Sequence, residues 1–257
     1  MSVARASCAA VALAIAIAAP CAAQEPSATP PGVVAPTEAV DSLFAFEHPI
    51  GAPLRTGPST YRLSLVRDAG SVALGERTVE VSEAQLGGAP TWLVAERRTG
   101  SAVPTTDSLW LSRAELTPMR WIGTVGRAQL AASFSHDSIF GALQSYAGRA
   151  SFTTPLLPGV LVTPGMTERI VEMLPLRTGY RAAVSLILVD MGTPRALPGE
   201  LSVDREERIN TSAGDADCWV VLLRAGAMEE RLWVDKGKRV VVRTEQMTAS
   251  GRVVAEL

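Results

Sequence analysis

The stretch that decides the fold is residues 78–95, TVEVSEAQLGGAPTWLVA. Residues 78–82 alternate with a period of two, which is the pattern of a strand with one buried face. Residues 87–90 (GGAP) supply turn chemistry, and residues 91–95 (TWLVA) return as the second strand of a hairpin. The sequence therefore predicts an antiparallel pair of strands at this point.

The same pattern continues along most of the chain. Turn residues recur about every ten positions, which is typical of an antiparallel sandwich or barrel. Together these segments predict an all-β fold, a curled antiparallel sheet or incomplete barrel of about 11–13 strands with one short helix. Further strands are expected at 61–65, 108–112, 119–124, 129–135, 139–146, 180–189, 200–211, 218–223, 231–234, 239–245 and 252–255.

One segment departs from the strand pattern and predicts a helix over residues 165–174. Met166, Ile170, Met173 and Leu174 recur there at helical spacing, and charged residues occupy the other positions. We expect this apolar stripe to lie over the open side of the curled sheet, either as a plug of the core or as a lid over a ligand site.

Residues 183–189 and 219–223 are apolar on both faces of the strands they predict. Each should therefore have apolar neighbours on both sides. One side could face the helix and the other the lumen of the sheet, and that lumen is either filled with side chains or large enough to hold a ligand. The residues expected to line an apolar ligand site are Met166, Ile170, Met173, Leu174, Leu186, Leu188 and Leu222.

The N-terminus carries the features of an export signal. Arg5 is the one charge before the apolar run 9–19, and small residues then lead to a cleavage position after Ala23. The run is too short to span a bilayer. We therefore expect residues 1–23 to be a signal peptide and the mature protein to be periplasmic or secreted.

Residues 24–41 are rich in proline and small polar residues, which predicts an extended, disordered linker. Residues 42–257 then form a single β-rich domain. An alternative is a lipoprotein acylated at Cys21, which would anchor the chain to a membrane. Pro20 disfavours it, because the position before an acylated cysteine normally carries a small residue.

The sequence offers little catalytic chemistry. His136, Asp137 and Ser138 are adjacent, whereas the members of a catalytic triad converge from separate segments. The carboxylate pairs 206–207 and 229–230 are neighbours on strands, so they cannot face each other as an acid–base pair, and they read as solvated faces. We expect no catalytic residue, no metal ligand and no cofactor.

Cys218 is the one cysteine left after signal cleavage, and its apolar neighbours predict a buried, inert thiol. Trp219 and Trp233 are expected to be large anchors on a packed face of their hairpin. The formal net charge of −2 gives no basic face for a nucleic-acid partner.

Several segments together resemble a family of bacterial exported β-rich proteins with no assigned function. In that family a strand ends in Asp, Leu-x-Pro opens the next strand, and a tryptophan strand precedes a basic, valine-rich one. The likeness extends over roughly residues 60–257. The segments that carry it are 106–111 (TDSLWL), 116–118 (LTP), 217–221 (DCWVV), 230–235 (ERLWVD) and 238–243 (KRVVVR).

That family is distantly similar to the carrier and receptor proteins that move lipoproteins across the periplasm. Those proteins are incomplete antiparallel barrels whose concave face holds acyl chains beneath covering helices. The resemblance implies the same kind of ligand here, and residues 156–162 (LLPGVLV) would correspond to the receptor's apolar loop.

The expected function is therefore that of a non-enzymatic envelope protein that binds a lipid or another apolar ligand in the concave face of its sheet. The alternative is a structural or interaction protein of the cell envelope, with a fully packed barrel, an envelope protein partner and peripheral membrane contact. A hydrolase is the least favoured reading.

Overall fold

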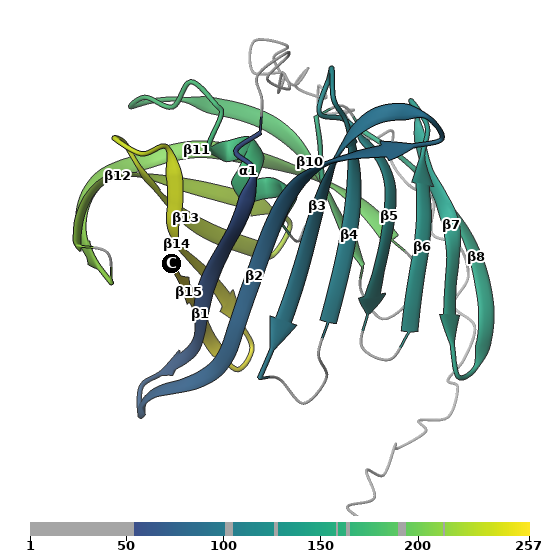
Figure 1. The fold of residues 1–257 in the computed structure, drawn as a ribbon. Helices are drawn as coiled ribbons and strands as arrows, with labels where there is room; N and C mark the ends of the chain where they lie inside the picture. The colour runs from purple at the N-terminus through teal and green to yellow at the C-terminus, as the bar shows by residue number, and fades with distance from the viewer. Residues whose placement is uncertain are drawn as a thin grey trace, which may run out of the picture. The chain divides into compact units, whose positions relative to one another are not determined.

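The structure of the protein is a computed structural model. It describes residues 54–100, 105–125, 128–157, 159–162, 165–189, 194–212 and 214–257. The expected signal peptide, linker and Cys21 lie outside the described residues. The described strands form one 15-stranded sheet, antiparallel except at one end, with one short helix (Figure 1). The predicted fold class is confirmed.

The first half of the sheet is a meander in which each strand pairs with the next along the chain. Its strands are β1 (Gly57–Arg67), β2 (Gly70–Leu86), β3 (Ala89–Thr99), β4 (Thr105–Ser112), β5 (Pro118–Val125), β6 (Ala128–Phe134), β7 (Ser138–Ser145) and β8 (Gly148–Pro155).

The second half is another meander, joined to the first where β1 pairs with β15. At its far end β9 pairs with β10 in parallel. Its strands are β9 (Val160–Val162), β10 (Arg181–Val189), β11 (Pro194–Thr211), β12 (Gly214–Ala225), β13 (Met228–Asp235), β14 (Val240–Thr248) and β15 (Gly251–Glu256).

The sheet curls until its two ends overlap, but it does not close. At one end β8 contacts β11, where the Thr154 hydroxyl donates to the Pro194 carbonyl oxygen at 2.7 Å. At the other end β9 contacts β5 from within the curl. Among the described strands the two terminal strands, β8 and β9, do not pair with each other. The sheet is therefore an incomplete barrel with a seam.

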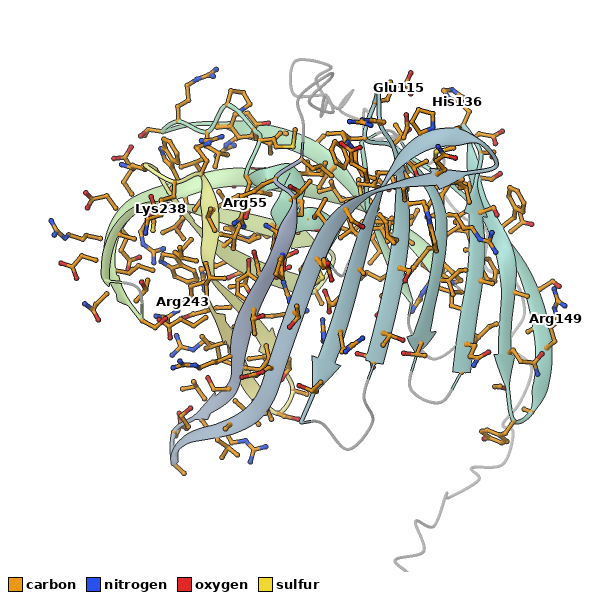
Figure 2. The ribbon with its side chains drawn as sticks, viewed as in Figure 1. Arg55, Glu115, His136, Arg149, Lys238 and Arg243 are labelled. Atoms are coloured by element: carbon orange, nitrogen blue, oxygen red, sulfur yellow. The ribbon has the colours of Figure 1, made fainter. Side chains whose placement is uncertain are left out.

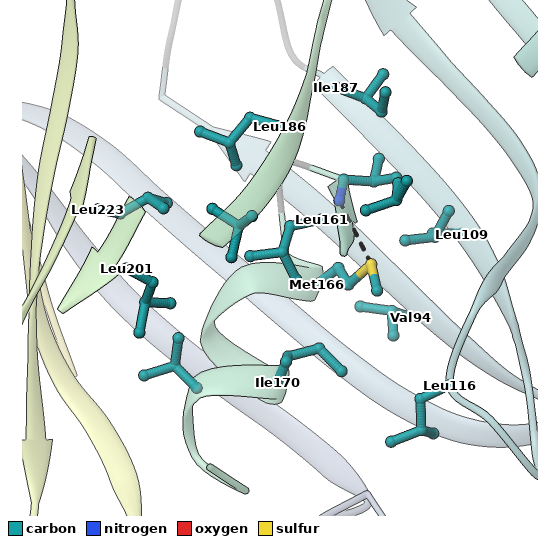
Figure 3. Close-up of a cluster of buried hydrophobic side chains, with 14 of the residues drawn as sticks. Val94, Leu109, Leu116, Leu161, Met166, Ile170, Leu186, Ile187, Leu201 and Leu223 are labelled. Carbon is teal, nitrogen blue, oxygen red and sulfur yellow. Dashed lines mark hydrogen bonds between the residues drawn. The ribbon is translucent and has the colours of Figure 1, made fainter. Parts of the chain in front are cut away.

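This overlap explains why β10 is apolar on both faces. Leu186 and Ile187 are neighbours on the strand and so point to opposite faces, yet both are fully buried within the main core (Figure 3). The prediction that this strand has apolar neighbours on both sides is confirmed.

The structure contains two strands more than the thirteen segments that the sequence indicates, and these are β8 and β9. Most β8 side chains are exposed on both faces, so the strand has no period-two hydrophobic signal. The three residues of β9 are all buried and lie in a stretch that reads as a loop. Neither pattern is one from which alternation can detect a strand.

Helix α1 (Met166–Val171) is shorter than the predicted 165–174 and lies on the concave side of the sheet. Gly165 precedes it with a φ of 85°, a left-handed conformation that favours glycine. A Cβ at this position would lie 3.4 Å from both Val94 and Glu96, so the helix begins close against β3. All six helix residues are buried.

The second face of β12 is covered as well. Val221 and Leu223 belong to the main core, whereas Cys218 and Val220 point to the opposite face and join a smaller cluster with Trp233. Trp219 packs instead against the main core. Both tryptophans therefore pack, as expected, but on opposite faces of the hairpin, because Trp233 pairs with Val220 rather than with Trp219.

Ile170 tests the role of the helix in the core, because its side chain is fully buried. Ile170→Ala should lower the free energy of unfolding by about 2–5 kcal/mol, since it leaves a cavity among packed side chains. Chemical denaturation measures this loss. Met247→Ala is the matched control: Met247 is 58% exposed, so its removal should change stability by less than about 0.5 kcal/mol. Equal stability of both variants would contradict the packing described here.

Candidate functional site

Most residues expected to line a ligand site form part of one packed core (Figure 3). Met166, Ile170, Leu174 and Leu186 are buried within it. Met173 and Leu188 are partly buried and pack against it.

Leu222 does not join this core. It lies between Val221 and Leu223, which belong to the core, and successive side chains on a strand point to opposite faces. Its inclusion in the concave site was therefore wrong, because a strand that is apolar on both faces gives no sequence signal of which face is concave.

Beside α1 the interior changes from apolar to charged. We call this region the interior polar layer, and its central group is the guanidinium of Arg77 on β2. Arg77 pairs with Glu168 of α1, and its Nε lies 3.8 Å from Oε2 of Glu96 on β3. All three side chains are buried. The further members of the layer are Tyr61, Arg98, Asp107 and Glu230.

The electrostatics of the layer follow from burial and pairing. Burial raises the pKa of Glu168, but the Arg77 guanidinium outweighs this and holds the pKa below its usual range. Burial lowers the pKa of Arg77, while the carboxylates of Glu168 and Glu96 raise it by more. Arg77 and Glu168 are therefore both charged inside the protein, where their mutual contact is the main compensation for lost hydration.

Two further side chains belong to the layer, those of Tyr61 on β1 and Arg98 on β3. The Tyr61 ring lies 5.0 Å from the Arg77 guanidinium carbon, and its hydroxyl donates to the Val241 carbonyl oxygen at 3.1 Å. Burial raises the pKa of Tyr61, so the hydroxyl stays protonated. Arg98, which is more exposed, holds the other oxygen of Glu96 at 2.7 Å.

Asp107 on β4 lies at the border of the layer. The indole nitrogen of Trp121 donates to its carboxyl oxygen at 3.1 Å. Burial raises the pKa of Asp107 to about 6, although this hydrogen bond opposes the rise.

The C-terminal end of α1 has its own polar contacts. Arg169 pairs with Glu172 at 3.0 Å, and the same carboxylate accepts the backbone N–H of Val241 at 3.0 Å. Arg239 donates from its Nε to the Glu172 carbonyl oxygen at 3.2 Å. The helix is therefore fixed by polar contacts to β2 at its start and to β14 at its end.

Glu230 is the residue that sequence reasoning missed. Residues 229–230 read as a solvated pair, yet Glu230 is half-buried on β13 and interacts with Glu168 and Glu96. Burial, reinforced by the charge of Glu168, raises the pKa of Glu230 to about 8. Glu230 is therefore mainly protonated at neutral pH. Glu229 takes the other face and pairs with Arg224 at 3.1 Å.

The other reactive side chains that the sequence offers lie near a turn and in the smaller buried cluster. Asp137 lies in an exposed turn between β6 and β7, Ser138 is the first residue of β7, and both bond to Ser135 (Figure 2 labels the adjacent His136). Cys218 is buried, and burial raises the pKa of its thiol to about 11. Among the described residues no group of three or more His, Cys, Asp or Glu could hold a metal ion.

A groove of about 450 Å³ lies on the convex face of β4–β8. Its lining is small and polar apart from a few apolar side chains, and it carries no carboxylate or histidine. The lining residues are Thr106, Ser108, Ile122, Gly123, Thr124, Gln129, Leu130, Ala131, Ala142, Gln144 and Arg149.

Comparison with known proteins finds no matching family model, no matching curated protein and no matching solved structure. Within the described part of the chain, no helix has the length and apolar character needed to cross a membrane.

Glu230 makes a pH-dependent contribution to stability. Its folded pKa of about 8 exceeds the unfolded value of about 4.3, so the folded state keeps a proton that the unfolded state releases. Stability therefore falls as pH rises between these values, by up to about 1.4 kcal/mol per pH unit. Glu230→Gln should remove this fall and be more stable than the wild type at pH 8, as measured by urea denaturation across the pH range.

Glu229→Gln is the matched control, because Glu229 is also half-buried but lies on the opposite face beside Arg224 and Arg231. It should keep the pH dependence of the wild type. A Glu230→Gln protein with the wild-type pH profile would show that Glu230 is solvated.

Proposed function

We propose that this chain is an exported, non-enzymatic envelope protein that binds a lipid or acyl chain within its curled sheet. The observation that carries the proposal is the seam. The described sheet encloses an apolar interior, yet its terminal strands β8 and β9 are not paired with each other.

A seam of this kind allows the interior to open at low cost. In a closed barrel, access between strands requires a ladder of backbone hydrogen bonds to break. Here β8 meets β11 through contacts such as the bond from Thr154 to Pro194. Separation of these two segments leaves every described strand pair intact.

Helix α1 occupies the place that the ligand would take. Its side chains fill the concave face between β9, β10 and the first half of the sheet. Met166 and Met173 are unbranched and flexible, so they can repack around an acyl chain. Uptake therefore requires α1 to shift, and its polar contacts set the cost of that shift.

The interior polar layer suits an amphipathic ligand. It lies beside α1, and its most exposed members are Arg98 and Glu230. An acyl chain in the apolar part would bring its polar end towards these groups.

One observation favours a second function, that of a structural or interaction protein with a filled interior. All six residues of α1 are buried, and Met166 and Ile170 are fully so. In that case the helix is a permanent part of the core and no ligand enters.

Titration with a fluorescent fatty acid separates these functions. The wild-type protein should bind the probe saturably, and Met173→Ala should bind it about ten-fold more weakly, because part of the apolar contact is lost. Met173 is only partly buried, so the variant should stay folded. Met247→Ala, altered at an exposed position, should bind like the wild type. Absence of saturable binding by the wild type would reject the ligand and favour the structural function.

A further inference from the structure

Strand β8 is an open edge of the sheet. It pairs with β7 on one side, and no described strand pairs with it on the other. Arg149, Ser151 and Thr153 are exposed along it, and Figure 2 shows Arg149 at this margin of the sheet. The opposite edge, β9, is buried inside the curl. Of the two ends of the described sheet, β8 is therefore the exposed one, although it contacts β11 at Thr154, near its C-terminal end.

The alternation of bonded and non-bonded pairs between β7 and β8 shows which backbone groups of β8 point away from β7. The N–H of Leu156 donates to the Asp137 carbonyl oxygen at 2.8 Å, next to the pair Ser138–Pro155. In an antiparallel ladder, bonded and non-bonded pairs alternate, and the N–H and C=O of non-bonded residues point outwards. Pro155, which has no N–H, occupies such a non-bonded position.

Counting back from Pro155 in steps of two, Thr153, Ser151 and Arg149 are the other residues whose backbone groups point away from β7. Native proteins commonly block an open edge with proline, inward charges or a covering loop. At β8 the one proline stands at the end of the strand, and the outward residues before it keep both donor and acceptor. The edge is a template for one more strand.

We propose that a second copy of this chain pairs with β8, antiparallel, about a two-fold axis that passes through Ser151. This register sets Ser151 against Ser151 and Arg149 against Thr153, so that the outward groups of both copies meet in bonded pairs. It also sets Ala150 against Phe152 on the concave face. The small residue faces the large one, and no like charges lie opposite each other.

The same register accounts for exposed apolar side chains beyond the strand. Tyr146, in the turn before β8, is 97% exposed, and Leu157, after its end, is 42% exposed. In the antiparallel pair Tyr146 of one copy comes opposite Leu156 of the other, next to Leu157. Apolar groups that are costly to leave in water in one copy would be covered in the dimer.

These features select a second copy over an unrelated extended segment. The bonded phase and the charge pattern are self-complementary about one residue, as an isologous interface requires. A foreign strand would need only the free backbone groups and would give no reason for exposed apolar residues to stand beyond both ends of β8.

Analytical ultracentrifugation of the wild-type protein, up to roughly 1 mM, should show a monomer–dimer equilibrium. Ser151→Asp and Ser151→Lys each place like charges opposite each other at the axis, so each should weaken dimerisation at least about ten-fold. An equimolar mixture of the two variants should restore the dimer. Gln129→Asp, an exposed change on β6, is the control and should dimerise like the wild type.

Three outcomes would overturn the proposal. They are a wild-type protein that stays monomeric throughout, a dimer that persists in Ser151→Asp, and a mixture of the charged variants that fails to dimerise. Ser151→Cys provides a second measurement that does not rely on charge. Directly opposite residues in a bonded antiparallel pair lie about 5.5 Å apart between Cα atoms, which a disulfide can bridge, so oxidation should give a covalent dimer.

Discussion

The buried guanidinium of Arg77 joins the helix to the sheet, and the arrangement of the interior depends on it. It contacts Glu168 on α1 and lies beside Glu96 on β3, whose second oxygen Arg98 holds. A charge in such a place is costly unless it is paired. Loss of either main partner would leave a buried charge uncompensated, at a cost of about 3–5 kcal/mol. The helix is thus held where it is by electrostatics as well as by apolar packing.

The packing of helix α1 against the concave face allows the sheet to curl without closing. With α1 on the concave face, β9 packs against it, and the sheet ends in overlap rather than in strand pairing. One consequence is an enclosed apolar interior that a seam can expose, which underlies the proposed ligand binding. Another is that β8 keeps a free edge, which underlies the proposed self-association. The two proposals rest on different parts of the sheet and can fail separately.

Local patterns in the sequence predicted much of this fold. Alternation around Val79 and Val81 indicated the hairpin of β2 and β3, helical spacing of Met166 and Ile170 indicated α1, and two-sided apolarity indicated that β10 is covered on both faces. Each of these signals is set by residues close together in the chain, where the periods of 2.0 and 3.6 apply.

What could not be predicted depends on contacts between distant segments. Alternation shows that Glu229 and Glu230 point to opposite faces, but not which face is concave, so the half-buried Glu230 was missed. Arg77 meets Glu168 across a long stretch of sequence, and no local pattern links them. β8 lacks a buried face and β9 is too short for a period, so neither gives a strand signal.

The central claim is that the Arg77–Glu168 pair holds α1 against the sheet. It is tested most directly by hydrogen–deuterium exchange of the amides at the end of α1. The N–H groups of Glu172 and Met173 donate to Glu168 and Ile170 at 3.0 Å, so they report on the helix itself. In the wild type these amides should exchange slowly, because the segment is buried. In Glu168→Gln they should exchange faster, while those of β3 and β4 stay protected. Unchanged exchange at Glu172 and Met173 in that variant would contradict the account, because it would show that Arg77 does not hold the helix in place.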